Sequence, residues 1–299
     1  GMSAKQALEV LAARSRWPHL RVEGLHLHVG SQVDSAEPLL AAARSALELA
    51  AESARRGARV SSINLGGGFA IDYAGSGATL DLAGYARAIA ALPGASAVRW
   101  CFEPGRWLVG PAGTLVAEVL WDKQRDDADG VHRFVVLAAG MNDLLRPALY
   151  GARHRVLLVA SGQPDADGAV VSGSFTGPTG ESETARVDRG TGALGVRSIP
   201  AGWSAADIVG PVCESSDQFA HSVPLPALAS GALLALLDAG AYGSAMSSNY
   251  NGRGRLAEVA QVNGELVLAR PAESPRVRDE SDREVSLGAP AAGSEARPR

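Results

Sequence analysis

Two kinds of segment alternate along the first part of the chain. Apolar runs that are short enough for buried strands cover residues 22–29, 60–65 and 97–102. Amphipathic stretches with apolar residues at helical spacing lie before and between these runs, at residues 4–15, 35–57 and 81–92. This order of strand, helix, strand, helix and strand predicts a parallel sheet covered by helices.

After Gly110 the pattern changes to strands without intervening helices. The candidate strands are residues 114–121, 133–137, 155–160, 169–173 and 233–239. Such a run predicts an antiparallel β domain over residues 113–270, following an α/β domain over residues 1–112. Residues 161–206 are expected to be a mostly irregular surface insertion around one or two short strands. The charged, Pro-rich and Ala-rich segment 271–299 is expected to be disordered.

The third apolar run ends abruptly in the polar sequence Glu103-Pro104-Gly105-Arg106. All three predicted strands end in glycine and polar residues, and in parallel α/β folds the active site lies at the carboxyl ends of the strands. Glycine turns with exposed amide groups suit a phosphate. A strand end with a surface ion pair is the alternative for Glu103 and Arg106. The glycines after residue 65 do not follow the dinucleotide-binding pattern Gly-x-Gly-x-x-Gly, so a dinucleotide is disfavoured.

Composition narrows the function classes. The formal net charge of −4 and the absence of a basic stripe argue against a nucleic-acid partner. No apolar run reaches the roughly 18 residues of a membrane span, and the two cysteines are too few for a disulfide scaffold. A cytoplasmic protein without a metal centre is therefore expected.

Several stretches resemble signatures of the fold-type III pyridoxal-phosphate-dependent decarboxylases, and they occur in the order typical of that family. They are residues 24–32 (GLHLHVGSQ), 64–69 (NLGGGF), 103–106 (EPGR) and 240–242 (GAY). Three further stretches resemble the branch of the family that acts on diaminopimelate: residues 139–150 (AGMNDLLRPALY), 210–217 (GPVCESSD) and 247–251 (SSNYN). The ordered set is specific, and it covers roughly residues 5–258.

The resemblance implies that pyridoxal 5'-phosphate binds at the carboxyl ends of the strands. His28 is expected to lie flat against the pyridine ring, and Glu103 is expected to face the ring nitrogen. A carboxylate there keeps that nitrogen protonated, so the ring can accept the electrons that remain when carbon dioxide leaves. The phosphate would be held by donors of Ser31, Gly66, Gly67, Gly68, Gly105, Arg106 and Tyr242.

The resemblance also implies a substrate with two amino-acid ends. Its carboxylates would bind Arg106 and Arg146, because guanidinium groups suit bidentate hydrogen bonds. Cys213 would protonate the α-carbon after decarboxylation. In the family this cysteine comes from the partner subunit, so a homodimer is expected, with Cys213 and Glu214 contributed across the interface. The remaining substrate contacts would come from Tyr150, Tyr242 and Glu214, the last accepting from the distal ammonium.

The chain departs from the family pattern in its lysines. It has only Lys5 and Lys123, and neither lies in a segment like that of the family's cofactor lysine. Three strand–helix units also cannot close an eight-stranded barrel. We therefore expect the carboxyl-terminal half of a (β/α)8 barrel and an antiparallel β domain, with a segment near residues 240–252 returning to the active site.

The expected parent activity is decarboxylation of meso-2,6-diaminopimelate to L-lysine, with this chain inactive alone. Two alternatives remain: a related decarboxylase with another amino-acid substrate, and a non-catalytic homologue that binds a full-length decarboxylase.

Overall fold

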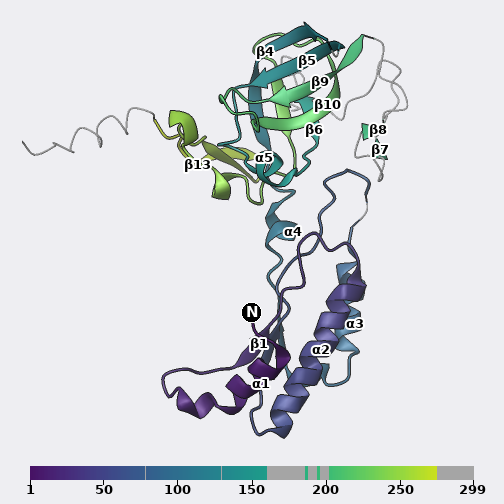
Figure 1. The fold of residues 1–299 in the computed structure, drawn as a ribbon, viewed down its shortest axis with the longest axis vertical. Coiled ribbons are helices and arrows are strands. Elements are labelled where there is room, and N and C mark those ends of the chain that lie inside the picture. Colours follow the sequence, from purple (N-terminus) through teal and green to yellow (C-terminus); the bar gives the residue numbers. More distant parts are fainter. Residues whose placement is uncertain (78, 129, 160–185, 188–193, 196–201, 275–299) are drawn as a thin grey trace, which may run out of the picture.

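The computed structural model has two lobes arranged along its long axis (Figure 1). It describes residues 1–77, 79–128, 130–159, 186–187, 194–195 and 202–274. The short helix α4 (Gly105–Val109) lies between the lobes and carries the chain from one to the other. The predicted strand at 169–173 and residues 275–299 of the predicted disordered segment lie outside the described residues.

The amino-terminal lobe contains a three-stranded parallel sheet with the order β1-β2-β3, which confirms the predicted parallel pairing. Its strands are β1 (Gly24–His26), β2 (Ser62–Asn64) and β3 (Arg99–Cys101). They are shorter than the predicted apolar runs, although backbone hydrogen bonds between the chain segments continue beyond the strand ends, as between the Leu65 amide and the Cys101 carbonyl. The helices of this lobe are α1 (Ala4–Ala12), η1 (Arg14–Arg16), α2 (Ala36–Arg55), α3 (Leu82–Ala90) and η2 (Ala95–Ala97).

Polar residues occupy the N-cap positions of the three α-helices of this lobe. The Ser3 side chain accepts from the Gln6 amide and the Gln6 side chain accepts from the Ser3 amide, which forms a capping box at the start of α1. Asp81 caps α3 through the Gly84 amide. Ser35 occupies the N-cap position of α2, but its side chain makes no capping hydrogen bond.

A hydrophobic core joins the helices to the sheet in the amino-terminal lobe. One face of α2 buries four residues at helical spacing, Leu39, Ala43, Ala46 and Ala50. They belong to the same buried cluster as Ile63 of β2 and side chains of α3. Full burial of one leucine-sized side chain contributes about 1.5–3 kcal/mol, so this face holds α2 on the sheet.

The carboxyl-terminal lobe is built on a six-stranded sheet with the order β10-β9-β5-β4-β11-β6. All neighbouring strands are antiparallel except β5 and β9, which are parallel. A parallel pair needs a long crossover, and here about 65 residues separate the two strands. The strands are β4 (Leu115–Asp127), β5 (Gly130–Leu137), β6 (Val156–Val159), β9 (Trp203–Val209), β10 (Gln218–Pro226) and β11 (Leu233–Leu236).

Smaller elements complete this lobe. Strand β9 begins at Trp203 and so overlaps the end of the segment that we expected to be an irregular insertion. Two short two-stranded sheets pair β7 with β8 and β12 with β13. These elements are α5 (Arg146–Tyr150), β7 (Arg186–Val187), β8 (Leu194–Gly195), η3 (Ser244–Met246), η4 (Tyr250–Gly252), β12 (Glu258–Val262) and β13 (Glu265–Arg270).

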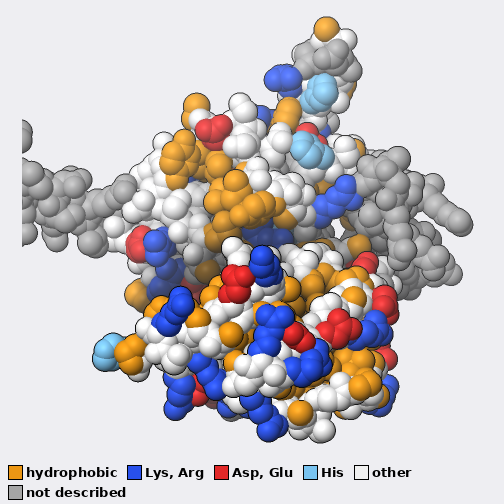
Figure 2. Space-filling view, turned by 60° about the horizontal axis from the view of Figure 1, so that its bottom comes forward, with side chains coloured by type: hydrophobic (Ala, Val, Ile, Leu, Met, Phe, Trp, Pro, Cys, Tyr) orange, Lys and Arg blue, Asp and Glu red, His pale blue; other side chains and the backbone are white. Residues whose placement is uncertain are grey.

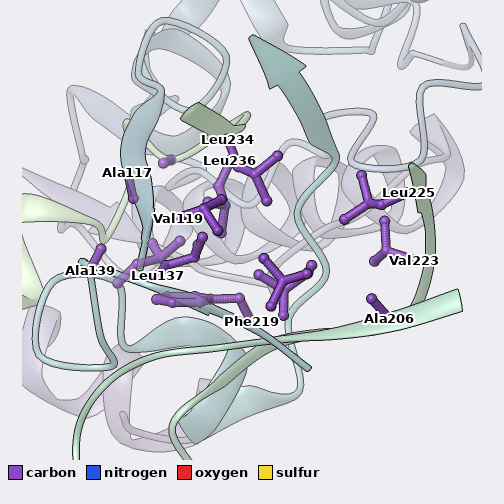
Figure 3. Packing of buried hydrophobic residues seen from close by; sticks show 14 residues of the cluster. Ala117, Val119, Leu137, Ala139, Ala206, Phe219, Val223, Leu225, Leu234 and Leu236 are labelled. Carbon is purple, nitrogen blue, oxygen red and sulfur yellow. The ribbon is translucent and has the colours of Figure 1, made fainter. Parts of the chain in front are cut away.

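The carboxyl-terminal lobe has its own hydrophobic core (Figure 3). Alternate residues of the strands point inward, as the period of two along a strand requires. Phe219 of β10 belongs to the same buried cluster as aliphatic side chains of β4, β5 and β11. The fully buried aliphatic residues of this core are Val119, Val135, Leu137, Leu144, Ile208, Leu234 and Leu236.

One buried ion pair ties four strands together. Arg133 of β5 is 7% exposed and donates to both carboxylate oxygens of Asp122 on β4, at 2.9 and 2.6 Å. The same guanidinium donates to Ser204 of β9 and to the carbonyl of Leu225 on β10. The hydrogen bond with Arg133 lowers the pKa of Asp122, because it stabilises the ionised carboxylate.

Candidate active site

Three glycines follow β2 and bring the ends of the three parallel strands together. A Cβ on Gly67 would overlap the carbonyl oxygen of Glu103, the residue that follows β3 by two positions. The Glu103 amide donates to the Gly66 carbonyl at 2.7 Å. On the other side, the Gly66 α-carbon lies so close to His28 that an added Cβ would come within 2.9 Å of Nδ1. Glycine at Gly67 therefore permits a contact that any side chain would prevent.

Asn64 holds the Glu103 carboxylate at this junction. Its side-chain amide donates to Glu103 Oε1 at 2.8 Å, and its own oxygen accepts the Gly66 amide at 2.8 Å. His26 Nε2 lies 3.5 Å from the same carboxylate oxygen. The Glu103 side chain is 56% exposed, and Oε2 has no hydrogen-bond donor among the described residues. One carboxylate oxygen is thus fixed by Asn64 and the other can accept a proton donor from a ligand.

Backbone and side-chain donors for an anion lie beside this carboxylate. Among the residues that the structure describes, the amides of Gly67 and Gly68 have no hydrogen-bond acceptor. Arg106, in the first turn of α4, reaches across the same edge and donates to the Ser31 hydroxyl at 2.8 Å. Two amides, a hydroxyl and a guanidinium together make a site for an oxyanion.

Two arginines meet at one phenol between the lobes. Tyr73 Oη accepts from Arg106 Nη1 at 3.1 Å and from Arg146 Nη1 at 2.8 Å. The two nitrogens therefore lie no more than about 6 Å apart. The Arg106 Cζ lies 5.2 Å and the Arg146 Cζ 6.0 Å from the centre of the Tyr242 ring, so cation–π contacts add to the hydrogen bonds.

Among the described residues, these two guanidiniums have no counter-ion. In the described part of the chain no carboxylate forms a salt bridge with either Arg106 or Arg146, and Arg146 is only 6% exposed. Two like charges about 6 Å apart repel each other by about 3 kcal/mol at an effective dielectric constant of 20. An anion that bridges them would remove this repulsion. The arrangement is typical of a carboxylate-binding or phosphate-binding site.

His154 supports Arg146 as a neutral base. Its Nε2 lies 3.2 Å from Arg146 Nη1 and its Nδ1 lies 2.8 Å from the carbonyl oxygen of Leu237. A guanidinium can only donate, so Nε2 must accept, and Nδ1 carries the hydrogen that the carbonyl binds. Burial lowers the pKa of His154, and the charge of Arg146 lowers it further. The ring is therefore neutral at physiological pH.

The segment after β11 returns Tyr242 to this cluster. The amides of Ala239 and Gly240 donate to the carbonyls of Gly113 and Gly110, at 2.8 and 3.0 Å. A Cβ on Gly240 would overlap the carbonyl oxygen of Val109, so this close approach to the end of α4 requires glycine. The structure thus places Tyr242 beside Arg106, although the two residues are far apart in the sequence.

The three stretches that resemble the diaminopimelate-specific branch meet around Met141 and Asn142. The Asp217 carboxylate accepts the Met141 amide at 2.6 Å and the Val212 amide at 2.7 Å, which closes the loop that carries Cys213 and Glu214. The Ser248 amide donates to the Asn142 carbonyl at 2.8 Å. Burial raises the pKa of Asp217, although its hydrogen bonds oppose that shift.

Some predicted site residues lie apart from these contacts. Cys213, Glu214 and Tyr150 are exposed, and among the described residues their side chains form no hydrogen bond or ion pair with Arg106 or Arg146. Lys5 lies on α1 and Lys123 on β4, where it pairs with Phe134, so neither lysine is at the strand ends. No group of three His, Cys, Asp or Glu side chains that could hold a metal occurs among the described residues.

Sequence reasoning missed Tyr73, His154 and Asp217. Tyr73 lies in a polar loop only four residues after the glycine motif, and that proximity is the one local signal for it. His154 bonds the carbonyl of Leu237, which is 83 positions away, so no local pattern marks it. Asp217 lies in the stretch 210–217 that carries the family resemblance, but its bond to the Met141 amide joins residues 76 positions apart.

Comparison with known proteins shows which family the chain belongs to. A sequence profile described as the C-terminal sheet domain of pyridoxal-dependent decarboxylases matches residues 33–240. The chain belongs to the pyridoxal-dependent decarboxylase family. Diaminopimelate decarboxylase of Helicobacter pylori is 32% identical to it over 275 residues, which are 92% of this chain and 58% of that protein. The enzyme of Neisseria meningitidis serogroup B is 34% identical over 274 residues, 92% of this chain and 56% of the relative.

Solved structures of decarboxylases share the fold. The crystal structure of diaminopimelate decarboxylase from Helicobacter pylori complexed with L-lysine matches with a TM-score of 0.75 and 29% identity, over 95% of this chain and 60% of that one. A lysine/ornithine decarboxylase from Vibrio vulnificus, 23% identical with a TM-score of 0.62 over 84% of this chain and 58% of that one, supports the fold alone. The chain spans a little more than half the length of the curated relatives.

The chain has surfaces that fit the cofactor of this family. The amides of Gly67 and Gly68 and the Ser31 hydroxyl form an anion-binding edge, and Glu103 presents a free carboxylate oxygen next to it. A pyridoxal phosphate has a phosphate at one end and a protonated ring nitrogen at another, so this donor and acceptor set suits it.

On the face shown in Figure 2, basic side chains are spread over the amino-terminal lobe without forming a single stripe. No described helix is long and apolar enough to cross a membrane.

Proposed function

We propose that this chain supplies most of the active site of a pyridoxal-phosphate-dependent decarboxylase that converts meso-2,6-diaminopimelate to L-lysine. The observation that carries the proposal is the uncompensated pair Arg106 and Arg146 beside the glycine junction. A site for a second carboxylate next to a phosphate site is what a substrate with two amino-acid ends requires. The relatives named diaminopimelate decarboxylase and the relative solved with L-lysine support the same substrate class.

The strand ends would hold the cofactor. The amides of Gly67 and Gly68, the Ser31 hydroxyl, the turn at Gly105 and Arg106, and the Tyr242 hydroxyl would hold its phosphate, and His28 would lie against its ring. Glu103, fixed through Asn64 at 2.8 Å, would accept the hydrogen of the ring nitrogen. The bound cofactor supplies an electron-accepting ring that stabilises the charge left on the α-carbon when carbon dioxide departs.

The remaining residues would bind the substrate and return a proton. Arg106 and Arg146 would bind carboxylates, with Tyr150 and Tyr242 adding hydroxyls. Glu214 would accept from the distal ammonium, and the Cys213 thiol would give its proton to the α-carbon. Both residues lie on an exposed loop, which suits a contribution to the site of a partner subunit in a homodimer.

The proposed architecture follows from the same family. The parallel sheet β1-β2-β3 corresponds to the carboxyl-terminal half of a (β/α)8 barrel, and the six-stranded sheet to the β domain after it. We propose a cytoplasmic location for this biosynthetic activity.

Ligand ranking tests the proposed substrate. The 299-residue chain is first titrated with pyridoxal 5'-phosphate by quenching of tryptophan fluorescence. In its presence, calorimetry then compares meso-diaminopimelate, L-lysine and cadaverine, which carry two, one and no carboxylates. Affinity is expected to fall in that order. Arg146→Gln should weaken diaminopimelate binding at least tenfold, because a hydrogen bond to a charged group contributes about 1.5–3 kcal/mol.

Arg87→Gln is the matched control, because Arg87 is an exposed arginine of α3 whose side chain is 75% exposed. This variant should bind all three ligands as the unsubstituted chain does. Cadaverine binding equal to that of diaminopimelate, or an unchanged ranking in Arg146→Gln, would contradict the proposal.

Turnover is expected to be absent in the isolated chain. Lys5 and Lys123 lie on α1 and β4, and a decarboxylase of this family needs a lysine amine to exchange the substrate onto the cofactor. Chromatography of amino acids after incubation with cofactor and meso-diaminopimelate should detect no L-lysine. Steady L-lysine formation would show that one of these two lysines serves.

A further inference from the structure

Among the described residues, Tyr73 is the one whose side-chain oxygen accepts hydrogen bonds from both Arg106 and Arg146. It lies on the loop of residues 71–77 of the amino-terminal lobe, which we call the tyrosine loop. Its oxygen accepts from Arg106 of α4 and from Arg146 of α5, at 3.1 and 2.8 Å. Its ring lies edge-on to His154, with the ring centres 5.5 Å apart. Three groups of the cluster therefore take their positions from one side chain.

Hydrogen bonds at its start and within it hold the tyrosine loop in shape. At its start, the Gln32 side chain bonds both the amide and the carbonyl of Ile71, at 3.3 and 2.5 Å. Within the loop, the Asp72 carboxylate accepts the amides of Ala74 and Gly77, at 3.1 and 2.5 Å. Burial disfavours ionisation of Asp72, but these backbone hydrogen bonds outweigh burial and lower its pKa.

The tyrosine loop also contacts the carboxyl-terminal lobe directly. A Cβ on Gly75 would come within 3.1 Å of Arg155 Cδ. Arg155 is itself fixed by Asp238, which is 4% exposed in its side chain and accepts from Arg155 Nη2 at 2.9 Å. The tyrosine loop that carries Tyr73 is therefore packed against a side chain that a buried carboxylate holds.

The chemistry of the hydroxyl explains how the arginines are spaced. A phenol oxygen accepts two hydrogen bonds and donates one. Arg106 and Arg146 use both acceptor sites, which leaves the hydroxyl hydrogen as a donor. Without this oxygen the two like charges would have no shared acceptor and would move apart.

We propose that Tyr73 is a positioning residue, which holds Arg106 and Arg146 at the separation that lets one substrate carboxylate bridge them. The proposal rests on the proposed function for the identity of that carboxylate. It predicts that removal of one oxygen atom from Tyr73 changes the positions of both guanidinium groups, although neither arginine is substituted.

The test compares Tyr73→Phe with Tyr85→Phe in the full 299-residue chain. Tyr85 is a matched control from the same lobe: its hydroxyl is buried, has no hydrogen-bond partner among the described residues, and lies next to Phe69 and Phe102. Both substitutions keep the ring and remove one oxygen, so both chains should fold. The guanidinium nitrogen signals of Arg106 and Arg146 are followed by NMR and assigned with Arg106→Lys and Arg146→Lys.

In the unsubstituted chain and in Tyr85→Phe, slow rotation about the Nε–Cζ bond should keep the two Nη signals of each arginine separate. In Tyr73→Phe they should merge, and the affinity for meso-diaminopimelate in the presence of pyridoxal 5'-phosphate should fall at least tenfold. Separate Nη signals in Tyr73→Phe would overturn the proposal. Because the NMR measurement needs no ligand, failure of the unsubstituted chain to bind diaminopimelate would contradict the proposed function and leave Tyr73 to be decided by the arginine signals.

Discussion

Replacement of Gly67 by alanine is expected to disrupt the junction of the three strand ends. The added Cβ would overlap the Glu103 carbonyl oxygen, which would have to retreat by about 1.3 Å to restore ordinary van der Waals contact. That carbonyl also accepts the Gly105 amide at 2.8 Å, so its displacement would disturb the turn that leads into α4. The Glu103 amide bonds the Gly66 carbonyl and would move with it.

The size of the effect follows from these contacts. Overpacking of a tight site costs about 1–3 kcal/mol, and a weakened backbone hydrogen bond adds about 0.5–1.5 kcal/mol. Gly67 is not among the glycines with positive φ, so alanine gains about 0.4–1 kcal/mol through the unfolded chain. The net loss in unfolding free energy of the amino-terminal lobe should be about 2–3 kcal/mol.

Urea unfolding followed by circular dichroism and tryptophan fluorescence measures this loss. Gly105→Ala is the stability control, because a Cβ there meets nothing within 4 Å, so it should not lower the unfolding free energy and should raise it by about 0.4–1 kcal/mol. Gly67→Ala should also bind pyridoxal 5'-phosphate at least tenfold more weakly. Unfolding of Gly67→Ala at the same urea concentration as the unsubstituted chain, with equal cofactor affinity, would refute the reasoning.

Two further predictions concern buried charges. Arg133→Met should lower the unfolding free energy by about 3–5 kcal/mol, because it leaves Asp122 buried without its partner; a loss below 1 kcal/mol in urea unfolding would contradict this. In the unsubstituted chain the depressed pKa of Asp122 contributes stability that is present above its unfolded pKa and lost as pH falls through the folded value. The lowered pKa of His154, which faces Arg146, Tyr73 and Asp238, contributes stability present above pH 6.5 and lost as pH falls toward the folded value. His154→Gln should therefore flatten the melting temperature between pH 7 and pH 5, and an unchanged slope would count against it.

The strand-end junction was predictable because its signals are local. Short apolar runs ending in glycine or in Glu103 specify both a buried strand and the chemistry at its end. The parallel order of β1, β2 and β3 followed from the helices between them. These features need only neighbouring residues to be recognised.

The contacts that Tyr73 makes with Arg106 and Arg146 between the lobes were not predictable from local signals, although the family resemblance named the two arginines. The bond between Tyr73 and Arg146 joins residues 73 positions apart, and neither polar side chain belongs to a periodic pattern. The parallel pairing of β5 with β9 depends on sheet order, which residue types within one strand do not specify. The Ser and Ala residues at the start of β9 resemble the composition of the Gly-, Ser- and Thr-rich sequence before it, which explains why its first residues were assigned to an insertion.

The position of the arginine cluster between two separate cores has a thermodynamic consequence. Each lobe buries its own apolar residues, and α4 carries the chain between them, so the lobes can unfold as distinct cooperative units. A ligand that engages Arg106, Arg146 and Tyr73 binds only when both units are folded and docked. By mass action, a ligand at 100 times its dissociation constant would add about 2.7 kcal/mol to that joint state. Occupancy of the site would then couple the two lobes into a single cooperative transition.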